Sequence, residues 1–224
     1  MSTPLRIDFV SDVACPWCAV GLAGLERALE ELQGTVTTEI HFQPFELNPA
    51  MPPEGEDVTE HIGRKYGSTP EQQAANREVI RERGASVGFT FNPAGRGRIW
   101  NTFDAHRLIF WAGLQGLEQQ HRIKRALLEA YHGLSLNPNE AQVLVDCAVK
   151  AGLDAEQARA VVDSEQYAEE VREQEQFFQE HGITSVPSVI VNNQYLIQGG
   201  QPAEAFVQAL RQIASQAESP ESAA

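Results

Sequence analysis

Two cysteines separated by two residues form the part of the sequence best suited to chemistry. Cys15 and Cys18 enclose Pro16 and Trp17, and four residues separate Cys15 from an apolar run that ends at Val10. Residues three apart on the first turn of a helix face the same way, so two sulfur atoms placed there can join as a disulfide or separate as two thiols. The spacing therefore indicates thiol–disulfide redox chemistry.

The position of Cys15 favours the role of nucleophile. The start of a helix has backbone N–H groups without partners and a partial positive charge, and both stabilise a thiolate. The helix dipole contributes at most about 2 kcal/mol, while Pro16 removes one donor and Trp17 adds no charge. We therefore expect a moderately acidic thiol at Cys15, with Cys18 as the resolving thiol that attacks the mixed disulfide.

Composition limits the class of protein. The chain has 224 residues, 42% of them hydrophobic, which is enough for one domain or one domain with a large insertion. Lys+Arg number 17 against 31 Asp+Glu, a formal charge of −14, which argues against nucleic acid or an anionic membrane as partner. The first residues lack the pattern of a signal peptide, and no later apolar run is long enough for a membrane helix. We predict a cytoplasmic protein, in which a pair of cysteines is redox-active rather than structural.

The hydrophobic pattern predicts an α/β fold. Strand 5–10, helix 19–33 and strand 35–46 form a β-α-β unit with parallel strands. After an irregular stretch at 47–55, helices are predicted over 69–83, 102–114, 123–131, 140–151, 154–162 and 164–181, with a loop at 89–98. A buried strand at 189–191, a turn at Asn192-Asn193 and an antiparallel strand at 194–198 then precede a last helix.

These elements divide the chain into four parts. Residues 1–48 form the N-terminal half of the fold, and residues 49–178 form a large all-helical insertion. Residues 179–215 form a β-β-α C-terminal half, and residues 216–224 are expected to be a disordered tail.

Four short sequences carry a resemblance to a known family. They are Cys15-Pro16-Trp17-Cys18, Pro44-Phe45-Glu46-Leu47-Asn48-Pro49, Ser185-Val186-Pro187-Ser188 and Gly199-Gly200-Gln201-Pro202. With them, residues 5–213 resemble the thioredoxin fold interrupted by a helical insertion, as in the DsbA-like oxidoreductases, and in particular their FrnE-type branch.

The resemblance implies a particular backbone beside the cysteines. The Val186-Pro187 bond would be cis and would lie against the disulfide. A proline there offers no N–H to the thiols, while the backbone of Val186 stays free to pair with an extended substrate strand.

Other polar residues are candidates for supporting roles. Asp12 and Glu46 could relay the proton of Cys18, which must leave before this thiol attacks; the alternative is a solvated surface position for each. A substrate groove could include Phe45, Asn48, Asn101 and His106, and the alternative for His106 is a hydrogen-bonded position in the core.

The third cysteine is expected to have a structural place. Cys147 lies among Val143, Leu144, Val145 and Val149 and is interpreted as a small buried hydrophobic residue, with a regulatory thiol as the alternative. Zinc prefers four ligands, and only Cys147 and six scattered histidines remain beside the cysteine pair. We therefore expect no metal and no permanently bound cofactor.

The function these observations favour is thiol–disulfide exchange on a disulfide-containing protein or peptide, with glutathione or another dithiol, such as a thioredoxin-type protein, as reductant. Reductase or isomerase work suits a cytoplasm near −220 mV better than oxidation does. One alternative is a glutathione-dependent transferase or isomerase of the kappa or 2-hydroxychromene-2-carboxylate isomerase type, which shares this fold but has serine where Cys15 stands. Another is a non-enzymatic peptide-binding or chaperone module. The apolar helices are compatible with a monomer or a homodimer.

Overall fold

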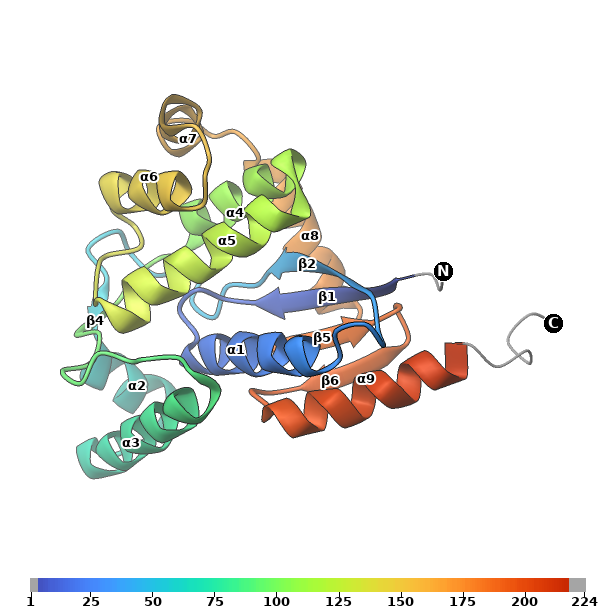
Figure 1. The fold of residues 1–224 in the computed structure, drawn as a ribbon. Helices are drawn as coiled ribbons and strands as arrows, with labels where there is room; N and C mark the ends of the chain where they lie inside the picture. Colours follow the sequence, from blue (N-terminus) through green and yellow to red (C-terminus); the bar gives the residue numbers. More distant parts are fainter. Residues whose placement is uncertain (1–3, 218–224) are drawn as a thin grey trace.

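A four-stranded mixed sheet lies at the centre of the computed structural model, which describes residues 4–217 (Figure 1). The strand order is β2-β1-β5-β6. Strand β1 (Leu5–Ser11) is parallel to β2 (Thr38–Pro44) and antiparallel to β5 (Ser188–Val191), which pairs with β6 (Tyr195–Gln198). The predicted parallel pair and the C-terminal hairpin are confirmed.

Helices cover both faces of the sheet. Neighbouring residues of β1 point to opposite faces, and each face packs against its own cluster of apolar side chains. Phe9 faces the main core with α1 (Pro16–Glu31) and α9 (Ala203–Ala217), which pack side by side (Figure 1). Val10 faces the other way, in a smaller cluster with Phe178 of α8 (Ala168–Glu180). Strand β1 therefore enters the site at residues 11–15 already buried on both faces.

The insertion between β2 and α8 contains more than helices. Its helices are α2 (Val58–Tyr66), α3 (Pro70–Val87), α4 (Phe103–Gln115), α5 (Leu117–Leu128), a π-helical turn (Glu129–Gly133), α6 (Ala141–Lys150) and α7 (Ala155–Val162). Two short strands, β3 (Glu56–Asp57) and β4 (Arg98–Ile99), also pair antiparallel there. This small sheet and α2 were missed by the sequence analysis.

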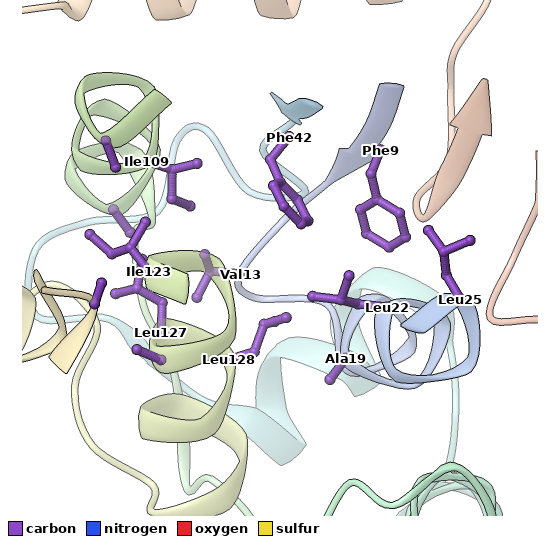
Figure 2. Close-up of a cluster of buried hydrophobic side chains, with 14 of the residues drawn as sticks. Phe9, Val13, Ala19, Leu22, Leu25, Phe42, Ile109, Ile123, Leu127 and Leu128 are labelled. Carbon is purple, nitrogen blue, oxygen red and sulfur yellow. The ribbon is translucent and has the colours of Figure 1, made fainter. Parts of the chain in front are cut away.

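The insertion shares one continuous core with the sheet. Figure 2 shows Ile123, Leu127 and Leu128 of α5 near Val13, and Leu22 of α1 lies to the right of this group. A polar contact fixes the same helix to the edge of the sheet, since the Gln120 side chain accepts from the Phe42 N–H at 3.0 Å and donates to its carbonyl at 3.2 Å. Helix α5 therefore covers β2 and is held in register with it.

The ends of several elements follow from single residues. Helix α3 begins with the capping box of Thr69 and Gln72. Helix α8 begins at Ala168, later than predicted, after Tyr167 with a φ of 64°. Helix α9 runs to Ala217, so the expected start of the tail at residue 216 was wrong, and residues 218–224 lie outside the described residues. None of the helices in the described part has the length and apolarity needed to cross a membrane.

Candidate active site

The cysteine pair lies at the start of α1, as predicted. Cys15 is the N-cap with extended backbone angles (φ −89°, ψ 115°), Pro16 is the first helical residue, and Cys18 lies in the first turn. Both thiols are free, and Cys15 retains 5% exposure whereas Cys18 has none. Cys15 is therefore the sulfur that a substrate can reach first.

The cis peptide bond implied by the resemblance is present between Val186 and Pro187. The Cys15 thiol donates to the Val186 carbonyl, with Sγ and O 3.6 Å apart. Pro187 packs directly on α1, since a Cβ added to Gly21 would lie 3.0 Å from its Cγ. The C-terminal half of the fold thus places the Val186 carbonyl directly across from the nucleophile.

The two thiols have opposite pKa shifts. The pKa of Cys15 is lowered, chiefly because the side chain of Cys18 donates to it and also because backbone N–H groups of the first helical turn do so. Burial raises the pKa of Cys18 well above its usual value, and the neighbouring Cys15 raises it further. The two shifts make Cys15 the thiol of the pair that ionises more easily, which suits it to nucleophilic attack.

Trp17 is half-buried rather than freely exposed. A Cβ on Gly200 would lie 3.0 Å from the Trp17 carbonyl oxygen and 3.1 Å from its ring. The Gly199-Gly200 sequence therefore lets the chain after β6 pass closely over the active-site turn.

The insertion holds the two carbonyl groups that precede Cys15. His132 donates from Nε2 to the Val13 carbonyl at 2.9 Å, and Arg96 donates from Nη1 to the Ala14 carbonyl. Burial lowers the pKa of His132 to about 3, so its ring is neutral at physiological pH. Arg96 and His132 were both missed, because the sequence gives no sign that distant loops meet at this turn.

Asp12 is fully buried beneath this turn, so the alternative of a solvated surface position was wrong. Its carboxylate accepts from Ala14 N at 2.9 Å and Leu47 N at 2.7 Å. It also accepts from Thr102 Oγ1 at 2.8 Å, and it lies 3.4 Å from His106 Nε2. Burial alone would raise the pKa of Asp12, but the hydrogen bond and charge of His106 together with the backbone donors lower it. Asp12 is therefore an ionised anchor for the active-site turn.

A lysine lies buried near the cysteine pair. Lys124 of α5 is 1% exposed, and its side chain makes no hydrogen bond or ion pair with any residue of 4–217. Burial lowers the pKa of Lys124, while the charges of Cys18, Asp12 and Cys15 act in the opposite direction. In the sequence alone, Lys124 looks like any other cation of an amphipathic helix. Its burial near the cysteine pair becomes evident only from the packing of α5.

Glu46 is buried as well, so the alternative of a solvated surface position was wrong for this residue too. It pairs with Arg172, whose guanidinium also contacts Glu175 at 2.7 Å. Burial and the nearby charge of Glu175 raise the pKa of Glu46. Oε1 of Glu46 and Oε1 of Glu175 have no hydrogen-bond partner in the described part of the chain.

The four residues predicted to form a substrate groove differ in burial, and the groove itself stays a prediction. Phe45 is 7% exposed in the cluster on the α8 side of the sheet. His106 is 2% exposed beside Asp12, too deep to contact a bound substrate, which agrees with its alternative as a core histidine. Asn48 accepts from His61 at 2.9 Å, and Asn101 accepts from Phe103 N at 2.9 Å.

Cys147 is buried on α6, as expected, and burial raises its pKa to about 12. It is therefore a thiol at neutral pH and a poor nucleophile. Within residues 4–217, no group of three or more His, Cys, Asp or Glu side chains is placed to hold a metal ion.

Comparisons with known proteins agree with this geometry. Over residues 6–211 the chain matches the model of the DSBA-like thioredoxin domain. It superposes with a TM-score of 0.85 on the crystal structure of the probable DsbA oxidoreductase SCO1869 from Streptomyces coelicolor, at 34% identity over 96% of this chain and 92% of that one. The cytosolic disulfide reductase DsbM from Pseudomonas aeruginosa, solved with GSH, shares the fold at 14% identity, with a TM-score of 0.63 over 93% of this chain and 98% of that one. The uncharacterized protein YwbO of Bacillus subtilis is 23% identical over 92% of this chain and 96% of its own length. The chain belongs to the family of DSBA-like thioredoxin domains.

Proposed function

We propose that this protein is a thiol–disulfide oxidoreductase of the FrnE type, in which Cys15 attacks a substrate disulfide and Cys18 resolves the product. The observation that carries the proposal is the asymmetry of the pair. Cys15 retains some exposure, has a lowered pKa and lies 3.6 Å from the Val186 carbonyl, whereas Cys18 is enclosed and has a raised pKa.

The exchange proceeds in two steps. The Cys15 thiolate attacks one sulfur of the substrate disulfide, a bond forms between Cys15 and that sulfur, and the other substrate sulfur leaves as a thiolate. Cys18 then loses its proton and attacks Cys15, which forms the Cys15–Cys18 disulfide and releases the second substrate thiol. The substrate gains two electrons, and the protein loses them.

The proton of Cys18 leaves in an enclosed site, and Lys124 is the group best suited to support that loss. Its positive charge lowers the pKa of Cys18 and stabilises the resolving thiolate. Asp12 is already ionised and fully hydrogen-bonded, so it stabilises the lysine and the turn. We also propose that Asp12 and Glu46 relay the proton of Cys18. The Glu46 carboxylate would do so while it is paired with Arg172.

The substrate is proposed to be a disulfide-containing protein or peptide, bound in extended form along the Val186 backbone. Two molecules of glutathione, or one dithiol protein of the thioredoxin type, would return Cys15 and Cys18 to the reduced state. The solved disulfide reductase DsbM is cytosolic and was crystallised with GSH, which supports a cytoplasmic site of action and a reductase direction.

The direct test is trapping of the mixed disulfide. A Cys18→Ser variant, incubated with a model peptide disulfide, should accumulate a covalent adduct at Cys15 that mass spectrometry detects and a reductant releases. A Cys15→Ser variant should accumulate none. If Cys18→Ser forms no adduct but catalyses addition of glutathione to an electrophile, the glutathione transferase or isomerase alternative replaces this proposal. If Cys15→Ser retains peptide binding and all biological activity, the binding module replaces it.

A further inference from the structure

An open cavity of about 530 Å³ adjoins the cysteine pair. Its walls come from α2, α3 and the loop of residues 91–97, and Pro16 closes the end nearest Cys15. Figure 1 shows α2 and α3 beside the first turn of α1. The larger apolar side chains of the lining are those of Val58, Ile62, Ile80, Phe91 and Pro93. A ligand bonded to Cys15 through sulfur would therefore have room for its neighbouring residues here.

Two arginines of the lining, Arg77 and Arg96, form no ion pair with a carboxylate in the described part of the chain. Asp57 accepts from two backbone N–H groups at the start of α2, and Glu78 is paired with Arg81. Arg77 makes no hydrogen bond or ion pair within residues 4–217, and Arg96 has no carboxylate within 4 Å there. In a chain with a formal charge of −14, two such cations at one cavity are unexpected for a merely solvated surface.

The two arginines lie close to each other and to the nucleophile. A Cβ on Gly95 would lie 4.0 Å from Cδ of Arg77, so the Arg77 side chain passes beside the residue that precedes Arg96. Arg96 in turn donates to the carbonyl of Ala14, directly before Cys15. The two cations thus extend from the cavity wall to the active-site turn.

The loop that carries Arg96 is held in place by the chain at the π-helical turn and just after it. Ser135 donates to the Gly95 carbonyl at 2.7 Å, and Asn92 N donates to the His132 carbonyl at 2.9 Å. The Arg96 guanidinium also lies over the Tyr131 ring, 5.3 Å from its centre. A cation fixed in this way loses little side-chain freedom on binding an anion, which favours selective recognition.

Resting on the function proposed above, we propose that this cavity binds the residues that flank the reactive cysteine of the substrate, and that Arg77 and Arg96 bind a carboxylate there. The protein therefore prefers acidic cysteine-containing ligands. The carboxylate could come from an acidic peptide segment or from glutathione, and both carry it within a few bonds of the cysteine.

The test measures how fast thiols reduce the oxidised protein. The thiolate attacks Cys15 and breaks the Cys15–Cys18 bond, and a second thiol then attacks the mixed disulfide and leaves as the ligand disulfide, so the protein gains two electrons. The probes are two five-residue peptides that differ only in glutamate or glutamine on both sides of one cysteine, together with glutathione and its diethyl ester. Each rate constant is divided by the rate of the same thiol with a small uncharged disulfide, which removes differences in intrinsic reactivity.

The wild-type protein should react about 2- to 5-fold faster with the charged member of a pair, which is the range expected for an exposed ion pair. The preference should disappear in about 1 M salt, where screening acts within about 3 Å. Arg77→Gln should remove most of it. Arg83→Gln is the matched control, because Arg83 is an exposed arginine on the same helix that does not line the cavity, and it should keep the preference.

The outcomes distinguish the two sources of the carboxylate. They also distinguish failure of this inference from failure of the proposed function. A preference within the peptide pair assigns the cavity to acidic peptide segments, and one confined to glutathione against its ester assigns it to that tripeptide; both support the inference. Equal rates within both pairs, or a preference that survives Arg77→Gln, would overturn the inference while the exchange itself stands. An oxidised protein that no thiol reduces would overturn the proposed function and the inference with it.

Discussion

The asymmetry between Cys15 and Cys18 is the residue-scale basis of the proposed chemistry. Donation from Cys18 is the first cause of the lowered pKa of Cys15. Removing that donor with Cys18→Ala should therefore slow alkylation of Cys15 at pH 7 by about tenfold, the value of one hydrogen bond to a charged group. Cys18→Ser keeps a hydroxyl donor and should retain most of the rate. Identical pH profiles of alkylation for the two variants would show that the donor plays no part.

Lys124 is the second residue whose effect can be measured. Its charge acts to lower the pKa of Cys18, so Lys124→Met should decrease the fraction of Cys18 present as thiolate. The attack of Cys18 on a Cys15–glutathione mixed disulfide, which closes the Cys15–Cys18 disulfide, should then be slower by about fivefold or more at pH 7. The pH at which closure becomes fast should move upward, an effect that loose packing alone would not produce. Lys150→Met, which removes an exposed lysine paired with Glu129, is the control. An unchanged closure profile in Lys124→Met would remove the lysine from the mechanism.

Sequence reasoning located the cysteine pair but not its surroundings. The spacing of Cys15 and Cys18 predicted their place at a helix start, and the family resemblance implied the cis bond between Val186 and Pro187. The burial of Asp12 and of Lys124 was not predicted, because burial of a charge depends on which distant elements cover it. A carboxylate at a strand end and a lysine on an amphipathic helix have the same local pattern whether they are solvated or enclosed.

At the scale of elements, helix α1 depends on close approach to the C-terminal half of the fold. A Cβ on Gly24 would lie 2.7 Å from the Gln201 carbonyl oxygen, so one of the two segments must move. Gly24→Ala should lower the free energy of unfolding by about 1–3 kcal/mol, as measured by chemical denaturation. Gly63→Ala is the matched substitution inside α2, where the nearest atoms lie at 3.5 and 3.6 Å. Alanine there should raise stability by about 0.5–1 kcal/mol. A stabilising Gly24→Ala would contradict this account of the packing.

Elements with strong local signals were predicted well, and weakly marked ones were not. The start of α3 near Thr69 was predicted, and so was the hairpin turn at Asn192 and Asn193, two residues with positive φ. Strands β3 and β4 have two residues each and pair across about forty residues of sequence, so no periodic pattern can reveal them. Helix α2 was missed because the one residue of this helix that is buried is a histidine, His61.

At the scale of the whole molecule, the insertion and the sheet meet at buried charges that make stability depend on pH. The pKa of Glu46 is raised above its unfolded value of 4.5, so ionised Glu46 weakens the fold at high pH, and this cost disappears as pH falls through the folded pKa. Glu46→Gln should therefore be more stable than wild type by about 1 kcal/mol at pH 8, and the difference should shrink toward pH 4.5.

Chemical unfolding at several pH values checks this expectation. Glu173→Gln is the control, since Glu173 is an exposed carboxylate on the same helix as Glu175 and reports the general effect of removing one negative charge. A Glu46→Gln variant that is less stable than wild type at pH 8 would mean that the ion pair with Arg172 outweighs burial.

The central claim concerns the molecule as a redox couple, and the redox titration of the Cys15–Cys18 pair against glutathione tests it most directly. Trp17, within the motif, supplies the fluorescence signal, and Cys15→Ser supplies the baseline. The account predicts one two-electron transition with a midpoint near or below the cytoplasmic poise of about −220 mV, and no transition in Cys15→Ser. Absence of a two-electron transition in the wild-type protein would contradict it.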